Sequence, residues 1–176
     1  MISFSASGID TKAEQAVVID FNTGEILFEK NSDFKMPPAS MTKIMTVYVA
    51  FDRIKNTELS IEDFCNVSAK AYKMGGSRTF LEIDDTVKID DLLKGIIIQS
   101  GNDASVALAE CLSGTENNFA SLMNVYADKL GMINTNFINS SGWPEENHYS
   151  SVYDLGILSN ALILKLKSKI PLFTKA

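Results

Sequence analysis

A single β-hairpin sequence near the N-terminus constrains the fold of this chain more than any other feature. Residues 16–30, AVVIDFNTGEILFEK, contain two β-rich runs on either side of Asn22-Thr23-Gly24. Glycine supplies the positive φ that a tight hairpin turn needs, so this segment predicts two antiparallel strands. A two-stranded hairpin by itself is only marginally stable in water.

Helical periodicity dominates much of the sequence after the hairpin. Pro37-Pro38 forces an extended approach, and the apolar spacing from Ile44 to Ile54 predicts a helix that begins near Ala39 or Ser40. Later apolar stripes predict helices over residues 90–99, 103–112, 115–130 and from 151 to the proline at 171. Their expected N-terminal caps are Asp90, Thr115 and Ser151, the last in capping-box spacing with Asp154, and Gly131 is expected at the C′ position of the third.

Residues 56–89 interrupt the helical pattern with a polar, weakly periodic stretch. We predict a loop-rich excursion there, with a turn at Gly75-Gly76-Ser77 and a possible short strand over Thr79–Ile83. Cys65 and Cys111 are too few and too far apart to indicate a disulfide scaffold or a zinc site. We interpret them as two buried thiols, which do not settle the redox compartment.

Composition narrows the class of protein. The 176 residues suit one domain, which we expect over 16–176 after a flexible lead-in over 1–15. The net charge of −6 argues against a nucleic-acid partner, because phosphate binding needs clustered Lys and Arg. The sequence contains no run of eighteen apolar residues, so it predicts no membrane-spanning helix. Met1–Thr11 has neither the basic nor the apolar region of a whole signal peptide.

Ser40 and Lys43 form the first candidate for catalytic chemistry. A serine in the first turn of a helix has free backbone N–H groups and the positive dipole end beside its hydroxyl, where an oxyanion would develop. Lys43 lies three residues on and therefore on the same helical face, within reach of the Ser40 oxygen. A lysine there takes the serine proton only if its amine is neutral, which requires burial or nearby cations.

Ser-x-x-Lys alone is a weak signal, because a chain of this composition produces about one such spacing by chance. Ser32 and Lys35 share the spacing, but they precede Met36-Pro37-Pro38 and are expected to be extended and to face in different directions. Taken in isolation, Ser40 and Lys43 have a simpler structural interpretation: Ser40 caps the helix, and Lys43 is a solvated residue of its first turn.

Ser100-Gly101-Asn102 strengthens the catalytic interpretation. It is the single Ser-x-Asn in the chain, and it lies on the turn that joins two predicted helices. An asparagine on a tight turn can hydrogen-bond a substrate amide or hold a lysine amine, and an adjacent serine can relay a proton. The alternative is a simple helix–helix turn with Asn102 as N-cap.

Together, PPASMTKIM at 37–45 and IIIQSGNDASVALAE at 96–110 resemble the first two signatures of the serine D-alanyl-D-alanine carboxypeptidases, the low-molecular-mass penicillin-binding proteins. The resemblance continues in order through GGSRTFLEI, NNFASLMNVYADKLGM and NTNFINSSGWP, and it extends from about Ala16 to Leu164. It implies an α/β (α+β) fold of the β-lactamase/transpeptidase type, in which a helical subdomain adjoins the N-terminal hairpin of an antiparallel sheet.

The resemblance also implies roles for single residues. Ser40 would attack the carbonyl of a terminal D-Ala-D-Ala bond, Lys43 would act as its base, Ser100 would pass a proton toward the leaving amine, and Asn102 would orient the substrate and Lys43. The implied partners are peptidoglycan stem peptides ending in D-Ala-D-Ala, and β-lactams that acylate Ser40. The implied location is the bacterial periplasm or the outer face of the cytoplasmic membrane, and no metal or organic cofactor is implied.

One family signature is absent from residues 1–176. The third motif, Lys-Thr-Gly, lies on a central strand of the family's sheet, whereas the sole Thr-Gly pair here is Thr23-Gly24. The C-terminal strands of the expected sheet are therefore missing beside the hairpin. We expect the 176-residue chain to aggregate, to self-associate through the exposed sheet edge, or to be a fragment of a longer protein.

Three other functions compete with that of an active carboxypeptidase. A truncated homologue would bind peptidoglycan peptide without efficient catalysis. A class A β-lactamase would normally have Ser-Asp-Asn in place of Ser100-Gly101-Asn102, and the surroundings of Glu145 and Glu146 do not match its deacylating motif. A Ser-His-Asp triad through His148 is rejected, because a lone histidine in a loop is more often a hydrogen-bonded structural residue. Trp143 and Tyr149 are candidates for cleft walls, with burial in the core as the more common alternative for such aromatics. Arg78 is expected to be a solvated loop residue rather than a carboxylate ligand.

Overall fold

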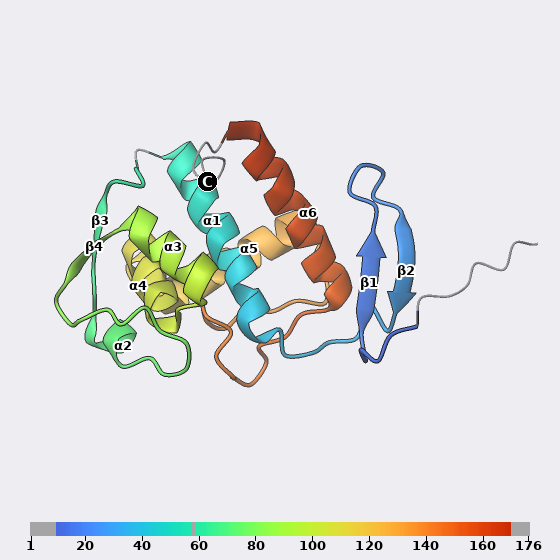
Figure 1. Cartoon of the computed structure of the whole chain (residues 1–176), viewed down its shortest axis with the longest axis horizontal. Helices are drawn as coiled ribbons and strands as arrows, with labels where there is room; N and C mark the ends of the chain where they lie inside the picture. The colour runs from blue at the N-terminus through green and yellow to red at the C-terminus, as the bar shows by residue number, and fades with distance from the viewer. Residues whose placement is uncertain (1–9, 58, 170–176) are drawn as a thin grey trace, which may run out of the picture.

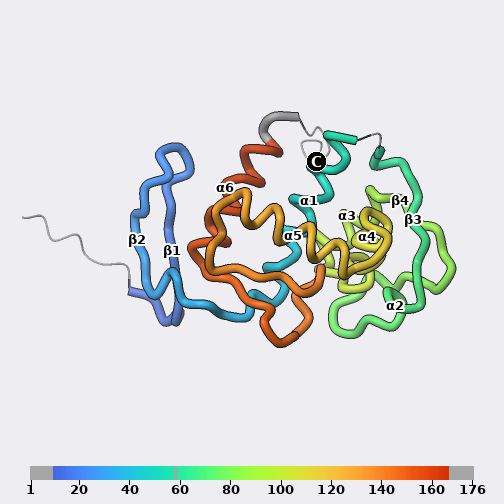
Figure 2. The backbone as a smooth tube through the Cα atoms, turned by 180° about the vertical axis from the view of Figure 1, so that it is seen from behind, coloured from blue at the N-terminus to red at the C-terminus, as the bar shows by residue number. Residues whose placement is uncertain are grey.

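A computed structural model of the chain describes residues 10–57 and 59–169. A helical body forms most of the molecule, and a β-hairpin lies at one side of it (Figure 1). The view from behind shows the same separation between the hairpin and the helices α3 and α4 at the far end (Figure 2). The elements in chain order are β1 (Ala16–Ile19), β2 (Ile26–Lys30), the 3-10 turn η1 (Ala39–Met41), α1 (Thr42–Asn56), β3 (Phe64–Asn66), α2 (Ala69–Tyr72), β4 (Thr86–Lys88), α3 (Ile89–Gln99), α4 (Asn102–Ser113), α5 (Glu116–Leu130) and α6 (Val152–Lys169).

The predicted N-terminal hairpin is confirmed. β1 and β2 are antiparallel, with Ala16 opposite Lys30, and the register shifts at a bulge between Val18 and Ile19. The Asp20 carboxylate fastens the turn by accepting hydrogen bonds from the backbone N–H groups of Asn22 (2.9 Å) and Thr23 (2.7 Å). Of the predicted lead-in, residues 1–9 lie outside the described part of the chain.

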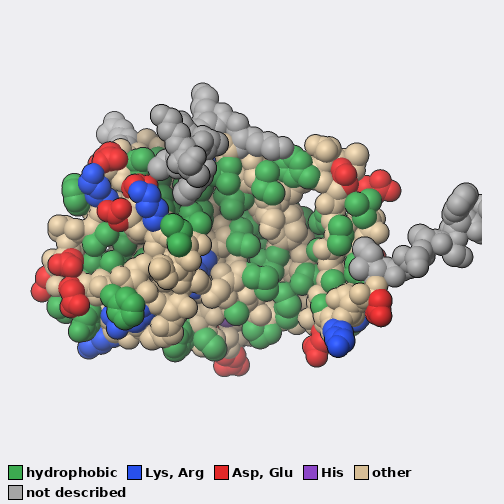
Figure 3. All heavy atoms as spheres, viewed as in Figure 1, with side chains coloured by type: hydrophobic (Ala, Val, Ile, Leu, Met, Phe, Trp, Pro, Cys, Tyr) green, Lys and Arg blue, Asp and Glu red, His purple; other side chains and the backbone are tan. Residues whose placement is uncertain are grey.

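The hairpin packs with one face on α6. A Cβ atom placed on Gly156 of α6 would come within 2.7 Å of Ile19 and 3.5 Å of Val17, so a larger residue there would push the hairpin away. Alternation along a strand turns Val18 to the opposite face, where it is 41% exposed. Figure 3 shows hydrophobic side chains on the visible surface of the hairpin and on the neighbouring helices. The hairpin therefore keeps an uncovered apolar side among the described residues.

The core lies inside the helical body. α4 is buried along nearly its whole length and packs against α1, α2, α3 and α5. Helix α1 contributes Met45 and Val49, and α5 contributes Phe119 and Met123, all fully buried. Burial of such side chains contributes roughly 1.5–3 kcal/mol each, so α4 is held firmly as the centre of the body. Among the described residues, no helix combines the length and the apolar character needed to cross a membrane.

Most predicted helices are confirmed, with shifted starts. The helix near Ala39 begins as η1 and continues as α1. Helix α3 starts at Ile89 with Lys88 as its N-cap, so the prediction of Asp90 as the cap was wrong; the Asp90 carboxylate instead pairs with Lys94, one turn along the helix. Helix α4 starts at Asn102, and Gly101 takes the cap position that the simple-turn alternative gave to Asn102.

The capping predictions for the last two helices hold in part. The Thr115 hydroxyl accepts from the Asn118 N–H at 3.1 Å, and Gly131 ends α5 with φ of +77°. At the start of α6 the Ser151 hydroxyl accepts from the Asp154 N–H at 3.1 Å. The Asp154 carboxylate accepts from Asn134 and Thr135 instead of completing the capping box. The proline predicted to end this helix lies outside the described residues.

The excursion between α1 and α3 contains β3, α2 and β4. β3 and β4 form a second antiparallel pair, in which Cys65 lies opposite Val87. The strand predicted over Thr79–Ile83 does not form. The reason is that the backbone N–H groups of Thr79 and Leu81 donate to the Asp103 carboxylate, at 2.9 and 3.2 Å, rather than to a neighbouring strand.

The two cysteines form a disulfide, so their interpretation as separate thiols was wrong. Cys65 on β3 is joined to Cys111 on α4, across 46 residues of sequence and 5.4 Å between Cα atoms. Sequence separation concealed this pair, because β3 is brought against α4 only by the fold of the excursion. The bond fixes the excursion to the central helix.

Candidate active site

Ser40 is presented at the surface by a strained turn. It occupies the middle of η1, and its side chain is exposed, whereas Thr42 and Lys43 immediately after it are buried. Ala39 before it has φ of +47°, a left-handed conformation that is unfavourable for a residue with a Cβ atom. The turn thus places Ser40 just before the start of α1.

Lys43 is held by three oxygen atoms. Its Nζ lies 3.3 Å from Ser40 Oγ, 2.7 Å from Asn102 Oδ1 and 2.8 Å from the backbone oxygen of Ser141. The lysine is 5% exposed, and this burial lowers its pKa to about 8, because the charged ammonium loses hydration. A usable fraction of the amine is therefore neutral near neutral pH.

The number of donors decides how the neutral amine is oriented. An ammonium has three N–H groups and can donate to all three oxygen atoms, whereas a neutral amine has two N–H groups and one lone pair. Asn102 Oδ1 and the Ser141 carbonyl are acceptors at shorter distances than Ser40 Oγ. When both are satisfied, the lone pair of Lys43 is left for the Ser40 hydroxyl, as a general base requires.

Asn102 lies where α4 begins and joins three parts of the chain. Its Oδ1 accepts from Lys43, its Nδ2 donates to the Gly75 carbonyl at 2.8 Å, and its backbone N–H donates to the Ser77 carbonyl at 2.8 Å. The asparagine thus links α1, the turn between α3 and α4, and the predicted turn at residues 75–77. Its Oδ1 and one of its two amide N–H groups are thus bonded within the protein.

Ser100 ends α3 two residues before Asn102. Its backbone is left-handed, with φ of +55°, which turns the chain from α3 into α4. Within the described residues, no hydrogen bond joins its hydroxyl to Ser40 or Lys43. Its role as a proton relay therefore stays a prediction.

The backbone of residues 139–142 is the part of the site that the residue pattern did not reveal. Its contribution is the Ser141 backbone carbonyl, and a carbonyl carries no residue-type signal in sequence. The signal available was the run Asn139-Ser140-Ser141-Gly142, whose composition marks a tight loop. Gly142 has φ of +80°, and a Cβ atom there would lie 1.7 Å from the Ala39 carbonyl oxygen, so only glycine lets this loop approach the serine turn.

One of the two candidate cleft aromatics borders the site. The Trp143 ring lies over the 75–76 turn, because a Cβ atom on Gly75 would be 3.3 Å from it, and the side chain is 43% exposed. Tyr149 is engaged elsewhere: the Lys35 ammonium lies 4.4 Å from the centre of its ring. Ser32 lies in a turn rather than an extended segment, and it donates to Glu29 at 2.9 Å, so Ser32 and Lys35 have different partners.

Arg78 is held within the excursion rather than solvated. Its guanidinium lies 5.5 Å from the Tyr72 ring centre and 5.7 Å from that of Phe80, and it donates to the Tyr72 carbonyl at 2.8 Å. Its Nε lies 3.8 Å from the buried Asp103 carboxylate. These contacts connect the loop around Arg78 to α2 and to Asp103 of α4.

His148 is buried and hydrogen-bonded, as expected for a structural histidine. The Ile138 N–H donates to its Nδ1 at 3.0 Å, so Nε2 carries the proton and donates to Thr42 Oγ1 at 2.9 Å. Burial lowers its pKa, which keeps the ring neutral. In the described part of the chain, no group of three or more His, Cys, Asp or Glu side chains is arranged to hold a metal ion.

Comparison with known proteins gives consistent matches. A family model described as D-alanyl-D-alanine carboxypeptidase matches residues 2–175. The chain is 45% identical over 152 residues to D-alanyl-D-alanine carboxypeptidase DacF of Bacillus subtilis, covering 86% of this chain and 39% of that protein. It is 40% identical over 164 residues to DacC of Escherichia coli, covering 90% of this chain and 40% of that one.

Solved structures agree with the sequence comparison. Penicillin-binding protein 5 of Haemophilus influenzae superposes with a TM-score of 0.89 at 36% identity, covering 92% of this chain and 48% of that one. Penicillin-binding protein D2 of Listeria monocytogenes, solved in an ampicillin-bound form, has a TM-score of 0.78 at 31% identity, covering 89% of this chain and 63% of that one. The chain thus spans about two fifths of the length of the curated relatives given above. These neighbours bear out the expected transpeptidase-like fold.

Proposed function

This chain belongs to the D-alanyl-D-alanine carboxypeptidase family, and we propose that it carries the nucleophile of a serine carboxypeptidase that removes the terminal D-Ala from peptidoglycan stem peptides. The observation that supports this most directly is the buried Lys43 amine 3.3 Å from the exposed Ser40 hydroxyl. A weak nucleophile needs an adjacent base of depressed pKa, and Lys43 has both the position and the pKa.

In the proposed reaction, the Ser40 oxygen forms a bond to the carbonyl carbon of the penultimate D-Ala while its proton passes to Lys43. The C–N bond to the terminal D-Ala then breaks, and the leaving amine takes a proton that Lys43 supplies through Ser100. Water hydrolyses the resulting ester, which releases the shortened peptide and restores the Ser40 hydroxyl. Asn102 keeps the Lys43 amine aligned, and it orients the substrate peptide in this proposal.

β-Lactams are proposed to acylate Ser40 through the same attack on a strained amide. The ampicillin-bound relative supports this for the family. A β-lactamase is less well supported, because Glu145 and Glu146 are exposed, and within the described residues neither side chain is hydrogen-bonded or ion-paired to Ser40 or Lys43. A class A enzyme would hold a glutamate near the acyl bond to activate the deacylating water.

We further propose that the protein works in the bacterial cell envelope, in the periplasm or at the outer face of the cytoplasmic membrane. The proposed substrate lies there. The Cys65–Cys111 disulfide supports this location, since disulfides persist mainly in oxidising compartments.

The test is release of D-Ala from a synthetic stem peptide ending in D-Ala-D-Ala, with the same peptide ending in L-Ala-L-Ala as the matched control. The protein is expressed from its complete coding sequence, beside Ser40→Ala. The proposal expects release only from the D-Ala-D-Ala peptide and only with Ser40 present. Binding of the peptide without release would favour the non-catalytic alternative.

A further inference from the structure

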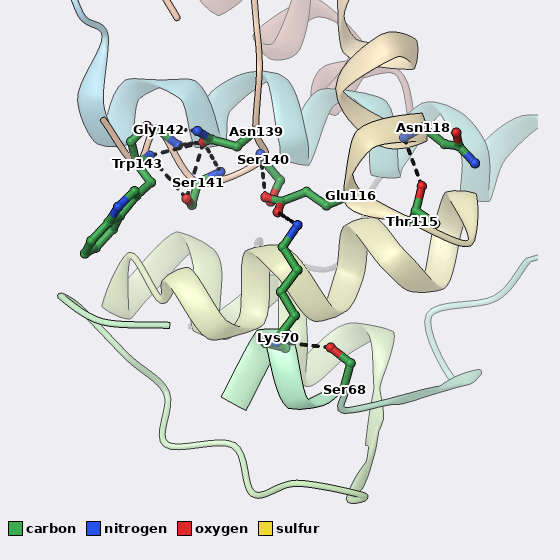
Figure 4. Close-up of polar contacts among 11 residues, drawn as sticks. Ser68, Lys70, Thr115, Glu116, Asn118, Asn139, Ser140, Ser141, Gly142 and Trp143 are labelled. Carbon is green, nitrogen blue, oxygen red and sulfur yellow. Dashed lines mark hydrogen bonds and ion pairs between the residues drawn. The ribbon is translucent and has the colours of Figure 1, made fainter. Parts of the chain in front are cut away.

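Glu116 has an unusual position for an acidic residue, because it is buried although it begins a helix. It is the first residue of α5 and is 5% exposed. One carboxylate oxygen accepts from the Ser140 backbone N–H at 2.9 Å and from the Ser140 hydroxyl at 2.7 Å. The other oxygen pairs with the Lys70 ammonium of α2 at 2.7 Å. Figure 4 shows Glu116 between the loop that carries Ser140 and the Lys70 side chain.

Ser140 connects this carboxylate to the candidate base. The Ser140 carbonyl accepts from the Thr46 hydroxyl of α1 at 2.6 Å, and the next carbonyl, that of Ser141, accepts from Lys43 Nζ at 2.8 Å. Glu116 therefore fixes the residue directly before the Ser141 carbonyl. The backbone N–H that Glu116 holds and the carbonyl that holds Lys43 belong to adjacent residues, Ser140 and Ser141.

Asn139 fixes the other end of the same loop. Its side-chain oxygen accepts from the backbone N–H groups of Gly142 at 2.8 Å and Trp143 at 3.1 Å, and its amide donates to the Trp143 carbonyl at 2.8 Å. These bonds close the loop on itself, as Figure 4 shows, but they do not attach it to another element. Attachment to the helical body comes from Glu116 and Thr46, which hold Ser140, and from Lys43 itself, which donates to Ser141.

We propose that Glu116 is a positioning residue for the acylation step: by holding Ser140, it fixes the Ser141 carbonyl that aligns the Lys43 amine with Ser40. The expected effect on the acylation rate rests on the proposed function. The expected effect on structure does not: the position of the Lys43 amine depends on the Glu116 carboxylate whether or not the protein is an active enzyme.

Two features distinguish this role from plain support of the fold. The oxygen that holds Ser140 is a different atom from the oxygen that pairs with Lys70, so the two contacts can be removed separately. Lys70 is half exposed and can turn into water, whereas Ser140 is fully buried. A glutamine at 116 keeps an oxygen acceptor for Ser140 but loses the ion pair with Lys70.

The experiment compares Glu116→Ala, Glu116→Gln and Lys70→Met in the protein expressed from its complete coding sequence. Stopped-flow measurement with a fluorescent penicillin gives the acylation rate constant and the preceding binding constant separately. Glu116→Ala is expected to lower the acylation rate constant about 10- to 100-fold with the binding constant unchanged, because misplacement by about 1 Å has that effect. Glu116→Gln and Lys70→Met are expected to acylate within about threefold of the parent although both lose the ion pair and melt at lower temperature.

A second readout needs no catalysis. Reductive methylation followed by peptide mass spectrometry reports how accessible the Lys43 amine is. Faster methylation of Lys43 is expected in Glu116→Ala and parent-like protection in Glu116→Gln.

The outcomes separate the two proposals. If the parent takes up no penicillin but Lys43 protection follows the side chain at 116, the proposed function fails and the positioning role stands. If Glu116→Ala acylates like the parent, or if acylation in the three variants simply follows melting temperature, the positioning role is overturned. Unchanged protection of Lys43 in Glu116→Ala overturns it as well.

Discussion

Lys43 and Asn102 are 59 residues apart in sequence, yet the lysine amine donates to the asparagine side-chain oxygen at 2.7 Å. This contact joins the first turn of α1 to the turn between α3 and α4, and both residues are buried. It brings the two sequence motifs together in one site. The contact also accounts for the orientation of the lysine toward Ser40, which lies 3.3 Å away.

Replacement of Asn102 tests that contact. Asn102→Ala removes one of the two carbonyl acceptors that orient the neutral Lys43 amine, and it frees the Gly75 carbonyl. We expect the acylation rate constant to fall about 10- to 100-fold, because the base loses its alignment. The measurement is the rate of fluorescent penicillin uptake. Asn102→Asp is the control: an added negative charge beside Lys43 raises the lysine pKa and should shift the pH profile upward.

The pH dependence of acylation follows from Lys43. The amine acts as a base only when it is unprotonated, and its pKa is lowered to about 8 by burial. Acylation is therefore expected to rise about tenfold per unit from pH 6 to 7 and to level off above pH 8. The profile is measured with penicillin uptake under conditions in which the protein remains folded. A rate that is flat from pH 6 to 9 would show that Lys43 is not the titrating base.

The disulfide gives a stability prediction. Reducing Cys65–Cys111, or replacing both cysteines by serine, releases the excursion from α4. We expect a loss of about 2–4 kcal/mol in the free energy of unfolding, because the crosslink restricts the unfolded chain. Urea unfolding with and without a reducing agent measures it. The double serine variant should be insensitive to the reducing agent, and equal stability of parent and variant would argue against a formed disulfide.

Asp103 is expected to make the fold sensitive to acid. Burial raises its pKa, but hydrogen bonds from Thr79, Ala104 and Leu81 outweigh burial and hold the pKa below the ordinary value of 3.8. A depressed carboxyl pKa contributes stability above pH 3.8, and this contribution is lost as pH falls through the folded-state value. Asp103→Asn should therefore melt below the parent at pH 7, with the difference narrowing below about pH 4. A difference that stays constant with pH would contradict this.

The sequence predicted the parts of this structure that depend on local pattern. The hairpin, η1 and α1, and the α5 caps follow from turn residues, apolar spacing and hydroxyl or glycine positions that act over a few residues. The pairing of Ser40 with Lys43 was predictable for the same reason, since both lie on one helical face. Local residues determine where these features form, although packing on the rest of the chain stabilises them.

Features that depend on distant contacts were not predictable in the same way. The Cys65–Cys111 bond needs the excursion to fold onto α4, and residues 79–83 avoid strand pairing because Asp103 takes their N–H groups. The Ser141 carbonyl reaches Lys43 only because Gly142 lets the loop approach Ala39. Every residue has a backbone carbonyl, so a carbonyl that tertiary contacts bring into the site cannot be recognised from a sequence motif.

We propose Ser40 as a nucleophile that Lys43 activates. Intact-mass spectrometry after incubation with a penicillin, followed by peptide mapping, tests it most directly in the protein expressed from its complete coding sequence. We expect one added penicillin mass on the peptide that contains Ser40, none in Ser40→Ala, and strongly slowed addition in Lys43→Ala. An adduct on another serine, or an unmodified parent that is folded by circular dichroism, would contradict it.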